Sequence, residues 1–334
     1  METGKSNIIA TSAAGIVQAD AAGIAAAAQV LSAGGIVAVP TETVYGLAAR
    51  ASDPAAVAAI YAAKGRPSFN PLIVHVLDVA QAETLAVLGP LAQRLAKAFW
   101  PGPLTLVVPR RAEAALAPAI SAGLETVALR CPAHSVMRAL VATVGPLAAP
   151  SANASGHISP TLAQHVADSL GERAPLILDA GACAAGLEST IVRADAESVT
   201  VLRQGSVTVE ALAAVLAPAP VLVAGEKAAI SAPGMMASHY APRQPVRLEA
   251  ETARADEFHI GFGHIEGDLN LSATGDLAEA AAGLFAALHA AEASGRAGIA
   301  VAPIPFTGLG AAINDRLGRA AAERGAENSG PASS

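Results

Sequence analysis

The sequence has little of what usually cross-links a small secreted fold. Its two cysteines, Cys131 and Cys183, lie far apart and form neither a Cys-x-x-Cys pair nor a Cys/His ligand spacing. That argues against a disulfide framework and against a zinc site. Aromatic residues are only 3% of the 334 residues, so Ala, Val, Leu and Ile must supply the cores. A reducing, cytoplasmic location fits this composition.

Basic residues are also scarce, with 21 Lys and Arg against 28 Asp and Glu and a formal charge of -7. Proteins that coat nucleic acid non-specifically neutralise many phosphates with Lys and Arg, so this balance argues against that class and leaves room only for a local basic cleft. The only lysines are Lys5, Lys64, Lys97 and Lys227. A lysine inside a motif is therefore informative.

The sequence also lacks a long apolar run and a secretory leader pattern. The stretch nearest to a membrane span, from Ala21 to Val39, is mostly Ala and Gly and is interrupted by Gln29 and Ser32. Its pattern predicts a helix, a turn and a strand. No basic region precedes a compact apolar segment at the N-terminus. We expect no contact with membranes.

What the chain does contain is an alternation of helical and strand patterns, which predicts an α/β fold. The expected helices lie near residues 20–34, 53–64, 91–99, 135–144, 208–216, 276–293 and 311–324. The expected strands lie near residues 36–39, 72–76, 104–108, 127–130, 147–149, 176–178, 191–193, 199–202, 246–248, 259–262 and 298–302. Chain length alone favours two domains.

The composition shifts to Pro, Ala and Gly near Ala217 and stays so to Pro245, which indicates a linker. This boundary divides the chain into parts. We predict a tail at 1–19, a larger domain at 20–217, a linker at 218–245, a smaller α/β domain at 246–325 and a tail at 326–334.

Polar residues follow the ends of several expected strands. Thr41 to Gly46 leaves the strand at 36–39, and ligands of open α/β sheets bind at such carboxyl ends. Lys64-Gly-Arg66 could place the ammonium of the lysine and the planar guanidinium of the arginine on phosphate oxygens, although no P-loop motif is present. Each cluster also has a plainer interpretation: a hydroxyl-rich turn, a solvated helix C-terminus and, for His75, a core histidine.

Two further clusters and the linker are equally ambiguous when taken singly. Ser151 and Asn153 leave a strand and could donate to phosphate oxygens or form an ordinary turn; no nucleophile elbow supports a hydrolase. Arg203 ends an apolar strand, where a charge is rarely left unpaired, or lies at a surface terminus. The linker carries His239 and Tyr240, side chains that a passive spacer does not need and that a lid over a site would use.

In combination, these segments resemble the Sua5/YrdC family of L-threonylcarbamoyladenylate synthases, in its long two-domain Sua5 form. The resemblance covers roughly residues 20–320. It rests on the ordered motifs PTETVYGL, KGRP, NPLIVH, WPGPLTLV, SANASG, ESTIV, LRQG, SAPGMMASHYAP and TGLGAAINDRL. It implies a YrdC-like catalytic domain, an open twisted mixed sheet with flanking helices, followed by a smaller, Rossmann-like α/β C-terminal Sua5 domain.

The resemblance also implies a reaction. Members of the family use ATP, L-threonine and bicarbonate to make threonylcarbamoyl-AMP and pyrophosphate, the first step of threonylcarbamoyladenosine modification of tRNA. It implies Mg²⁺ bound through the ATP phosphates, with no protein side chains as metal ligands. The expected partner is the downstream tRNA threonylcarbamoyl transferase machinery, and direct contact with tRNA stays open.

Site residues are implied motif by motif. Those expected to act on the ATP phosphates are Lys64, Arg66, Ser151 and Asn153. Those expected to complete the nucleotide site are Asn70, Thr126, Thr161, Arg203, His239 and Tyr240. Those expected to bind L-threonine are Thr43, His75, Arg130 and Ser189. Arg130 is a natural partner for the carboxylate of the amino acid.

Two positions depart from the family pattern: Gln204 stands where Pro is common and Met236 where Lys is common. The first should only loosen a turn, whereas the second could weaken a contact between the linker and a phosphate. Two other functions stay open. A double-stranded RNA or tRNA-binding module without adenylation activity is disfavoured by the acidic balance. A carbamoyl transferase of the hydrogenase-maturation type is disfavoured because acylphosphatase-like and zinc-finger segments are missing.

Overall fold

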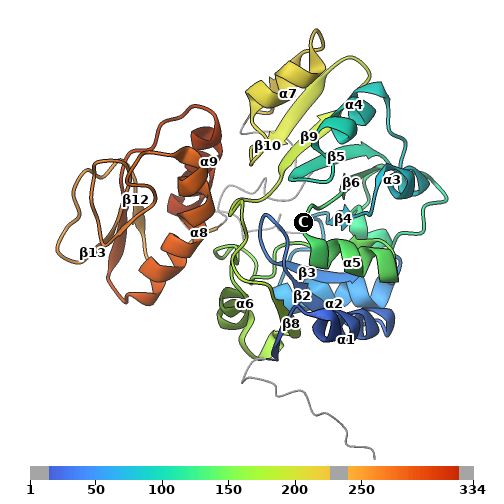
Figure 1. Ribbon diagram of the computed structural model, residues 1–334, viewed down its shortest axis with the longest axis horizontal. Coiled ribbons are helices and arrows are strands. Elements are labelled where there is room, and N and C mark those ends of the chain that lie inside the picture. The colour runs from blue at the N-terminus through green and yellow to red at the C-terminus, as the bar shows by residue number, and fades with distance from the viewer. Residues whose placement is uncertain (1–14, 226–239, 323–334) are drawn as a thin grey trace, which may run out of the picture.

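The protein, seen here as a computed structural model described over residues 15–225 and 240–322, contains two separate sheets with flanking helices (Figure 1). The large sheet is mixed and has the strand order β1-β8-β2-β3-β7-β4-β6-β5-β9-β10-β11. Its strands are β1 (Ile16–Gln18), β2 (Val37–Val39), β3 (Gly46–Arg50), β4 (Ile73–His75), β5 (Leu104–Pro109), β6 (Thr126–Arg130), β7 (Leu147–Ala148), β8 (Leu176–Asp179), β9 (Thr190–Ala194), β10 (Val199–Arg203) and β11 (Val221–Val223).

Helices cover both faces of the large sheet. They are α1 (Ala21–Ser32), α2 (Pro54–Lys64), α3 (Val79–Leu85), α4 (Pro90–Phe99), α5 (Ser135–Val144), α6 (Ala163–Leu170) and α7 (Val209–Leu216). The apolar residues of α1 and α5 share one core with alternate residues of β2, while those of α2, α4, α6 and α7 share the core on the other face. Alternation along β2 explains this division, because Val37 and Val39 point to one face and Ala38 to the other.

Local sequence determines where several helices begin and end. Asp20, Asp53 and Asp276 are N-caps whose carboxylates accept hydrogen bonds from the first-turn backbone amides of α1, α2 and a later helix, α8 (Leu277–Ala293). Helix α2 ends at Gly65, whose φ of 60° lies in the left-handed region that glycine adopts without strain. That turn directs the chain from Lys64, at the end of the helix, toward Arg66.

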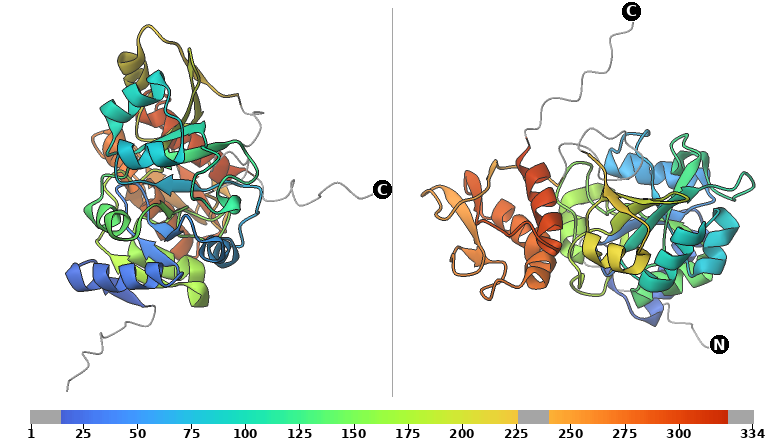
Figure 2. Two further views of the ribbon diagram at one scale, coloured as in Figure 1. Left: turned by 90° about the vertical axis from the view of Figure 1, so that its right-hand side faces the viewer. Right: turned by 90° about the horizontal axis from the view of Figure 1, so that it is seen from above.

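The small sheet is entirely parallel, with the order β12-β15-β13-β14. Its strands are β12 (Val246–Arg247), β13 (Glu257–Gly261), β14 (Leu269–Asn270) and β15 (Gly298–Val301), and its helices are α8 (Leu277–Ala293) and α9 (Leu309–Ala321). Both helices lie between this sheet and the large domain in Figure 1 and in the right-hand view of Figure 2. The contact between the two parts of the chain is therefore made mainly by helices.

An apolar cluster continues across this contact. Ile158 and Leu187 of the large domain and Tyr240 are buried together with residues of α8 and α9 such as Phe285 and Ile313. Burial of these side chains favours a fixed arrangement of the two domains over free tethering. Within the described ranges, no helix combines the length and the apolar character needed to cross a membrane.

The predicted fold class, a mixed α/β sheet with a smaller α/β domain after it, is confirmed. Differences concern short elements. β1 lies inside the expected N-terminal tail, because its three residues pair with β8 although they are too few to show a period. β11 lies inside the expected linker and pairs with β10. The pattern also did not predict β3, α3, α6 or β14.

Candidate active site

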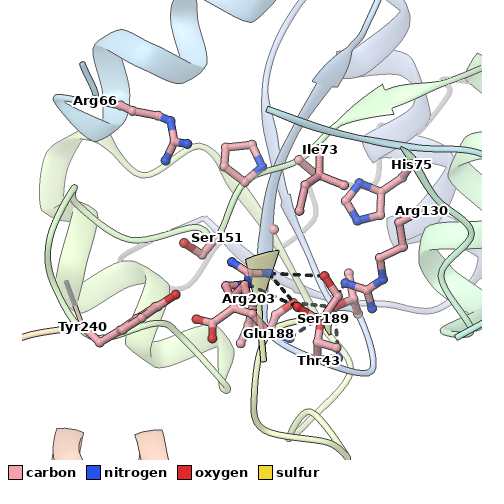
Figure 3. A pocket seen from close by; sticks show the side chains of 15 residues that line it. Thr43, Arg66, Ile73, His75, Arg130, Ser151, Glu188, Ser189, Arg203 and Tyr240 are labelled. Carbon is pink, nitrogen blue, oxygen red and sulfur yellow. Dashed lines mark hydrogen bonds between the residues drawn. The ribbon is translucent and has the colours of Figure 1, made fainter. Parts of the chain in front are cut away.

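A pocket is lined by residues of β4, β6 and β10 and of the segments that follow β2 and β7 (Figure 3). Segments far apart in the sequence contribute to it, and they come from strands that run in both directions, since β4 pairs antiparallel with β7. Its lining comprises Thr41, Thr43, Val44, Gly46, Arg66, Ile73, His75, Arg130, Ala149, Pro150, Ser151, Glu188, Ser189, Arg203 and Tyr240. Eight residues predicted from motifs are among them: Thr43, Arg66, His75, Arg130, Ser151, Ser189, Arg203 and Tyr240.

Arg130 forms one wall of the pocket from the last position of β6. Its guanidinium pairs with Glu42 at 2.7 Å and donates to the hydroxyl of Thr43 at 2.9 Å. Burial opposes the charge of Glu42, but the adjacent guanidinium lowers the pKa of this carboxyl below its ordinary value. Arg130 is thus held rigidly, with its charge beside the cavity.

His75 is next to Arg130 in the sheet, since β4 and β6 pair in parallel with these two residues in register. Burial, followed by repulsion from Arg130, lowers the pKa of His75 to about 3. The ring is therefore neutral at physiological pH. Its Nδ1 atom has no hydrogen-bond partner among the described residues, so it can bond a ligand in the pocket.

Ser189 and Arg203 lie between the two ends of the pocket (Figure 3). Arg203 donates to the carbonyl oxygen of Ser189 at 3.0 Å and to its hydroxyl at 3.3 Å, and that hydroxyl also bonds Thr105 at 2.7 Å. Gly205 allows this closeness, because a Cβ there would approach the carbonyl oxygen of Glu188 to 2.4 Å. Burial lowers the pKa of Arg203.

Arg66 lies at the other end of the pocket, with Ser151 and Tyr240 on the same side (Figure 3). It donates to the carbonyl oxygens of Asn70 at 3.2 Å and Pro71 at 2.9 Å. Burial lowers the pKa of Arg66 to about 10, so it remains protonated at neutral pH. Arg66, Arg203 and Arg130 outnumber Glu188 among the charged side chains that line the pocket.

Lys64 lies behind this wall and is not part of the pocket lining. Its ammonium donates to the carbonyl oxygens of Ser151 at 2.6 Å and Asn153 at 2.5 Å. The Lys-x-Arg and Ser-x-Asn segments therefore come together as predicted. Burial, followed by repulsion from Arg66, lowers the pKa of Lys64 well below its ordinary value. Through its two hydrogen bonds, Lys64 fixes the loop that begins at Ser151.

The remaining predicted residues are distributed around the pocket. Asn70 and Asn153 are buried close to Arg66 and Lys64. Thr126 begins β6, about 13 Å along the strand from Arg130, and Thr161 is buried with its backbone amide bonded to His165. Neither Thr126 nor Thr161 lines the pocket. His239, like Met236, lies outside the described residues.

Sequence reasoning assigned no role to Glu42, Glu188 or Arg316, although each lies inside a quoted motif. Glu188 lines the pocket and pairs with Arg316 of α9 at 2.8 Å. The available signal was a charge within an otherwise apolar or hydroxyl-rich motif, where burial requires a partner. Within residues 15–225 and 240–322, no group of three or more His, Cys, Asp or Glu side chains could hold a metal ion.

The mixed α/β sheet and its cationic, hydroxyl-lined pocket are those of an enzyme that acts on small anionic substrates. The family profile described as "Telomere recombination", which groups Sua5, YciO and YrdC, matches residues 29–205. A second profile, "Threonylcarbamoyl-AMP synthase, C-terminal domain", matches residues 207–322. The chain belongs to the Sua5/YrdC family and has the C-terminal domain of its two-domain members.

Similar proteins include a Bacillus subtilis threonylcarbamoyl-AMP synthase, 42% identical over 90% of this chain and 93% of its own length. A threonylcarbamoyl-AMP synthase of Pyrococcus abyssi is 38% identical over 89% of this chain and 94% of its own. The crystal structure of P. abyssi Sua5 complexed with L-threonine superposes with a TM-score of 0.81, at 36% identity and covering 89% of this chain and 94% of that one.

Proposed function

We propose that this protein is an L-threonylcarbamoyladenylate synthase that converts ATP, L-threonine and bicarbonate into threonylcarbamoyl-AMP and pyrophosphate. The observation that carries the proposal is one pocket with two chemically different ends. Arg130, His75 and Thr43 line one end, and Arg66 and Ser151 the other. An amino acid and a triphosphate need two such ends close together, because the new bond joins them.

We assign L-threonine to the end formed by Arg130, His75 and Thr43, with Ser189 in the middle of the pocket as a further contact. The guanidinium of Arg130 can form charge-assisted hydrogen bonds with the substrate carboxylate. Neutral His75 and the hydroxyl of Ser189 offer uncharged hydrogen bonds to the amino acid. That a relative was crystallised with L-threonine supports this assignment.

We assign the ATP phosphates to Arg66, Ser151 and Arg203, with Lys64, Asn70 and Asn153 supporting that wall from behind. The amine of threonine condenses with bicarbonate, with loss of water, to give an N-carboxylate. A carboxylate oxygen then attacks the α-phosphorus, and the bond to the oxygen that bridges the α- and β-phosphates breaks, so that pyrophosphate leaves. Preorganised cations stabilise the negative charge that develops there. Thr126 and Thr161 remain predictions for parts of the nucleotide that extend beyond the pocket.

We infer that Mg²⁺ enters with the nucleotide, held by phosphate oxygens and water in the way this ion prefers. The donor set fits this inference, since the carboxylates nearest the pocket, Glu42 and Glu188, are each paired with an arginine. Bound there, the ion would neutralise phosphate charge. The protein's own contribution is to orient the two substrates and to exclude water from the carbamate.

Incubating the protein with ATP, L-threonine and bicarbonate, and detecting the adenylate by mass spectrometry, tests the proposed function. Omitting each substrate in turn should abolish the product. Pyrophosphate release that does not depend on threonine would contradict the assignment. Salt-dependent binding of tRNA without any turnover of ATP would instead favour the RNA-binding module. Retention of the adenylate until the tRNA-modifying enzymes are added would support the proposed downstream partners.

A further inference from the structure

Arg316 is the largest fully buried side chain of the described residues, and it comes from α9 of the small domain. Arginine is almost never fully buried unless it is paired. Its guanidinium reaches across the domain contact toward the pocket. It donates to Glu188 at 2.8 Å and to the backbone carbonyl of Gln204 at 2.8 Å, and it pairs with its neighbour Asp315 at 2.5 Å.

Two of these partners belong to the segments that form the middle of the pocket. Glu188 precedes Ser189, and Gln204 follows Arg203. Arg203 itself donates to the carbonyl of Ser189. Arg203, which lines the pocket, therefore connects these two segments on the pocket side. The guanidinium of Arg316 connects the same two segments on the side of the small domain.

Arg316 also lies over the ring of Tyr240, 5.1 Å from its centroid. Tyr240 lines the pocket and has a φ of 63°, in the left-handed region that side chains other than glycine seldom occupy. Packing must hold such a residue in place. Arg316 and Phe285, whose ring centroid is 5.6 Å from that of Tyr240, supply that packing from the small domain.

The ion pair between Arg316 and Glu188 also affects the charge of the pocket. Glu188 is a buried carboxylate on the pocket lining, and it also accepts a hydrogen bond from Ser159 at 2.5 Å. Burial opposes its charge, but the guanidiniums of Arg316 and Arg203 lower its pKa below the ordinary value, so it stays ionised. Without Arg316, this negative charge would face a triphosphate with Arg203 alone to balance it.

We propose that Arg316 is a positioning residue through which the C-terminal domain tunes the active site. It neutralises Glu188, joins the Glu188 and Gln204 segments and holds Tyr240 against the pocket. This inference rests on the proposed function. It assigns the small domain a part in nucleotide binding that acts through residues of the pocket lining.

The test compares Arg316→Leu with the double variant Glu188→Gln/Arg316→Leu. We expect Arg316→Leu to raise the KM for ATP about tenfold or more, because an uncompensated carboxylate now repels the phosphates. The double variant removes that charge and should recover most of the affinity for ATP. Its kcat should stay below that of the wild type, because Tyr240 still lacks the packing of Arg316.

Arg296→Leu is the matched control, because Arg296 also belongs to the small domain and pairs there with Asp268 at 2.8 Å. It should leave both KM values unchanged. Arg316→Lys covers the case in which Arg316→Leu does not fold. It keeps the charge but loses the planar fork, so the KM for ATP should stay near that of the wild type while kcat falls.

An unchanged KM for ATP in folded Arg316→Leu would overturn the inference. So would equal losses in the single and double variants, since these would indicate a purely structural role. If Arg316→Lys has to be used, a kcat equal to that of the wild type would overturn it. Failure of the proposed function is distinguishable, because the wild-type protein would then form no adenylate in the parallel assay.

Discussion

Replacing Lys64 by Met removes the ammonium while keeping a side chain of similar length. The variant loses charge-assisted hydrogen bonds to the carbonyls of Ser151 and Asn153, each worth about 1.5–3 kcal/mol. The gross loss of about 3–6 kcal/mol is offset because desolvating a buried ion costs several kcal/mol. We therefore expect the free energy of unfolding to fall by only about 1–3 kcal/mol, and the protein to remain folded.

Activity should suffer far more than stability. The loop that begins at Ser151 loses its anchor, and Arg66 loses the neighbouring cation of the phosphate wall. We expect pyrophosphate release to fall about 100-fold or more, equivalent to about 2.7 kcal/mol of transition-state stabilisation. The rate of pyrophosphate release at saturating substrates measures the effect on activity. Urea unfolding of the same protein preparation measures the effect on stability.

Lys97→Met is the control, since Lys97 lies exposed on α4 and should tolerate the change in both assays. A rate of pyrophosphate release in Lys64→Met equal to that of the wild type would refute the role of Lys64. A variant whose KM rises only for L-threonine would show that the division of the pocket is wrong.

Three further predictions concern the rest of the molecule. Arg130→Ala should raise the KM for L-threonine about 10–100-fold and spare ATP binding in calorimetry, since hydrogen bonds to a charged group are worth about 1.5–3 kcal/mol; loss of ATP affinity instead would contradict this. The folded pKa of His75 is about 3 against 6.5 in the unfolded chain, so acid destabilises the fold. Lowering the pH from 7 to 5 should cost about 2 kcal/mol through this group, and His75→Gln should flatten the pH dependence of urea unfolding by that amount; parallel curves would argue against it. Deleting the residues after Ala224 should strongly reduce the rate of adenylate formation, while the large domain stays folded. Full activity of the truncated chain would exclude a role for the linker and small domain.

Motif order and polar spacing in the sequence were enough to predict the family and the α/β class, both of which the comparisons and the fold confirm. They also singled out most of the residues that line the pocket. The polar segments at strand ends can be read from local patterns, but the strands around the pocket run in both directions, so the pairing that brings these segments together cannot be read from them. The short strands β1 and β11 escaped prediction, because three residues show no period and their hydrogen-bond partners come from elsewhere in the chain.

Local sequence determined the helix caps at Asp20 and Asp53, the turn at Gly65 and the residue types available to the pocket. Only the tertiary structure decided which of these side chains face the pocket and which support it. Lys64 is an example, since its ammonium bonds two backbone carbonyls that lie nearly ninety positions further along the chain. Arg316 is another, because nothing within α9 reveals that its partner is Glu188. Both depend on long-range packing, because a buried charge needs partners and here the partners come from distant parts of the chain.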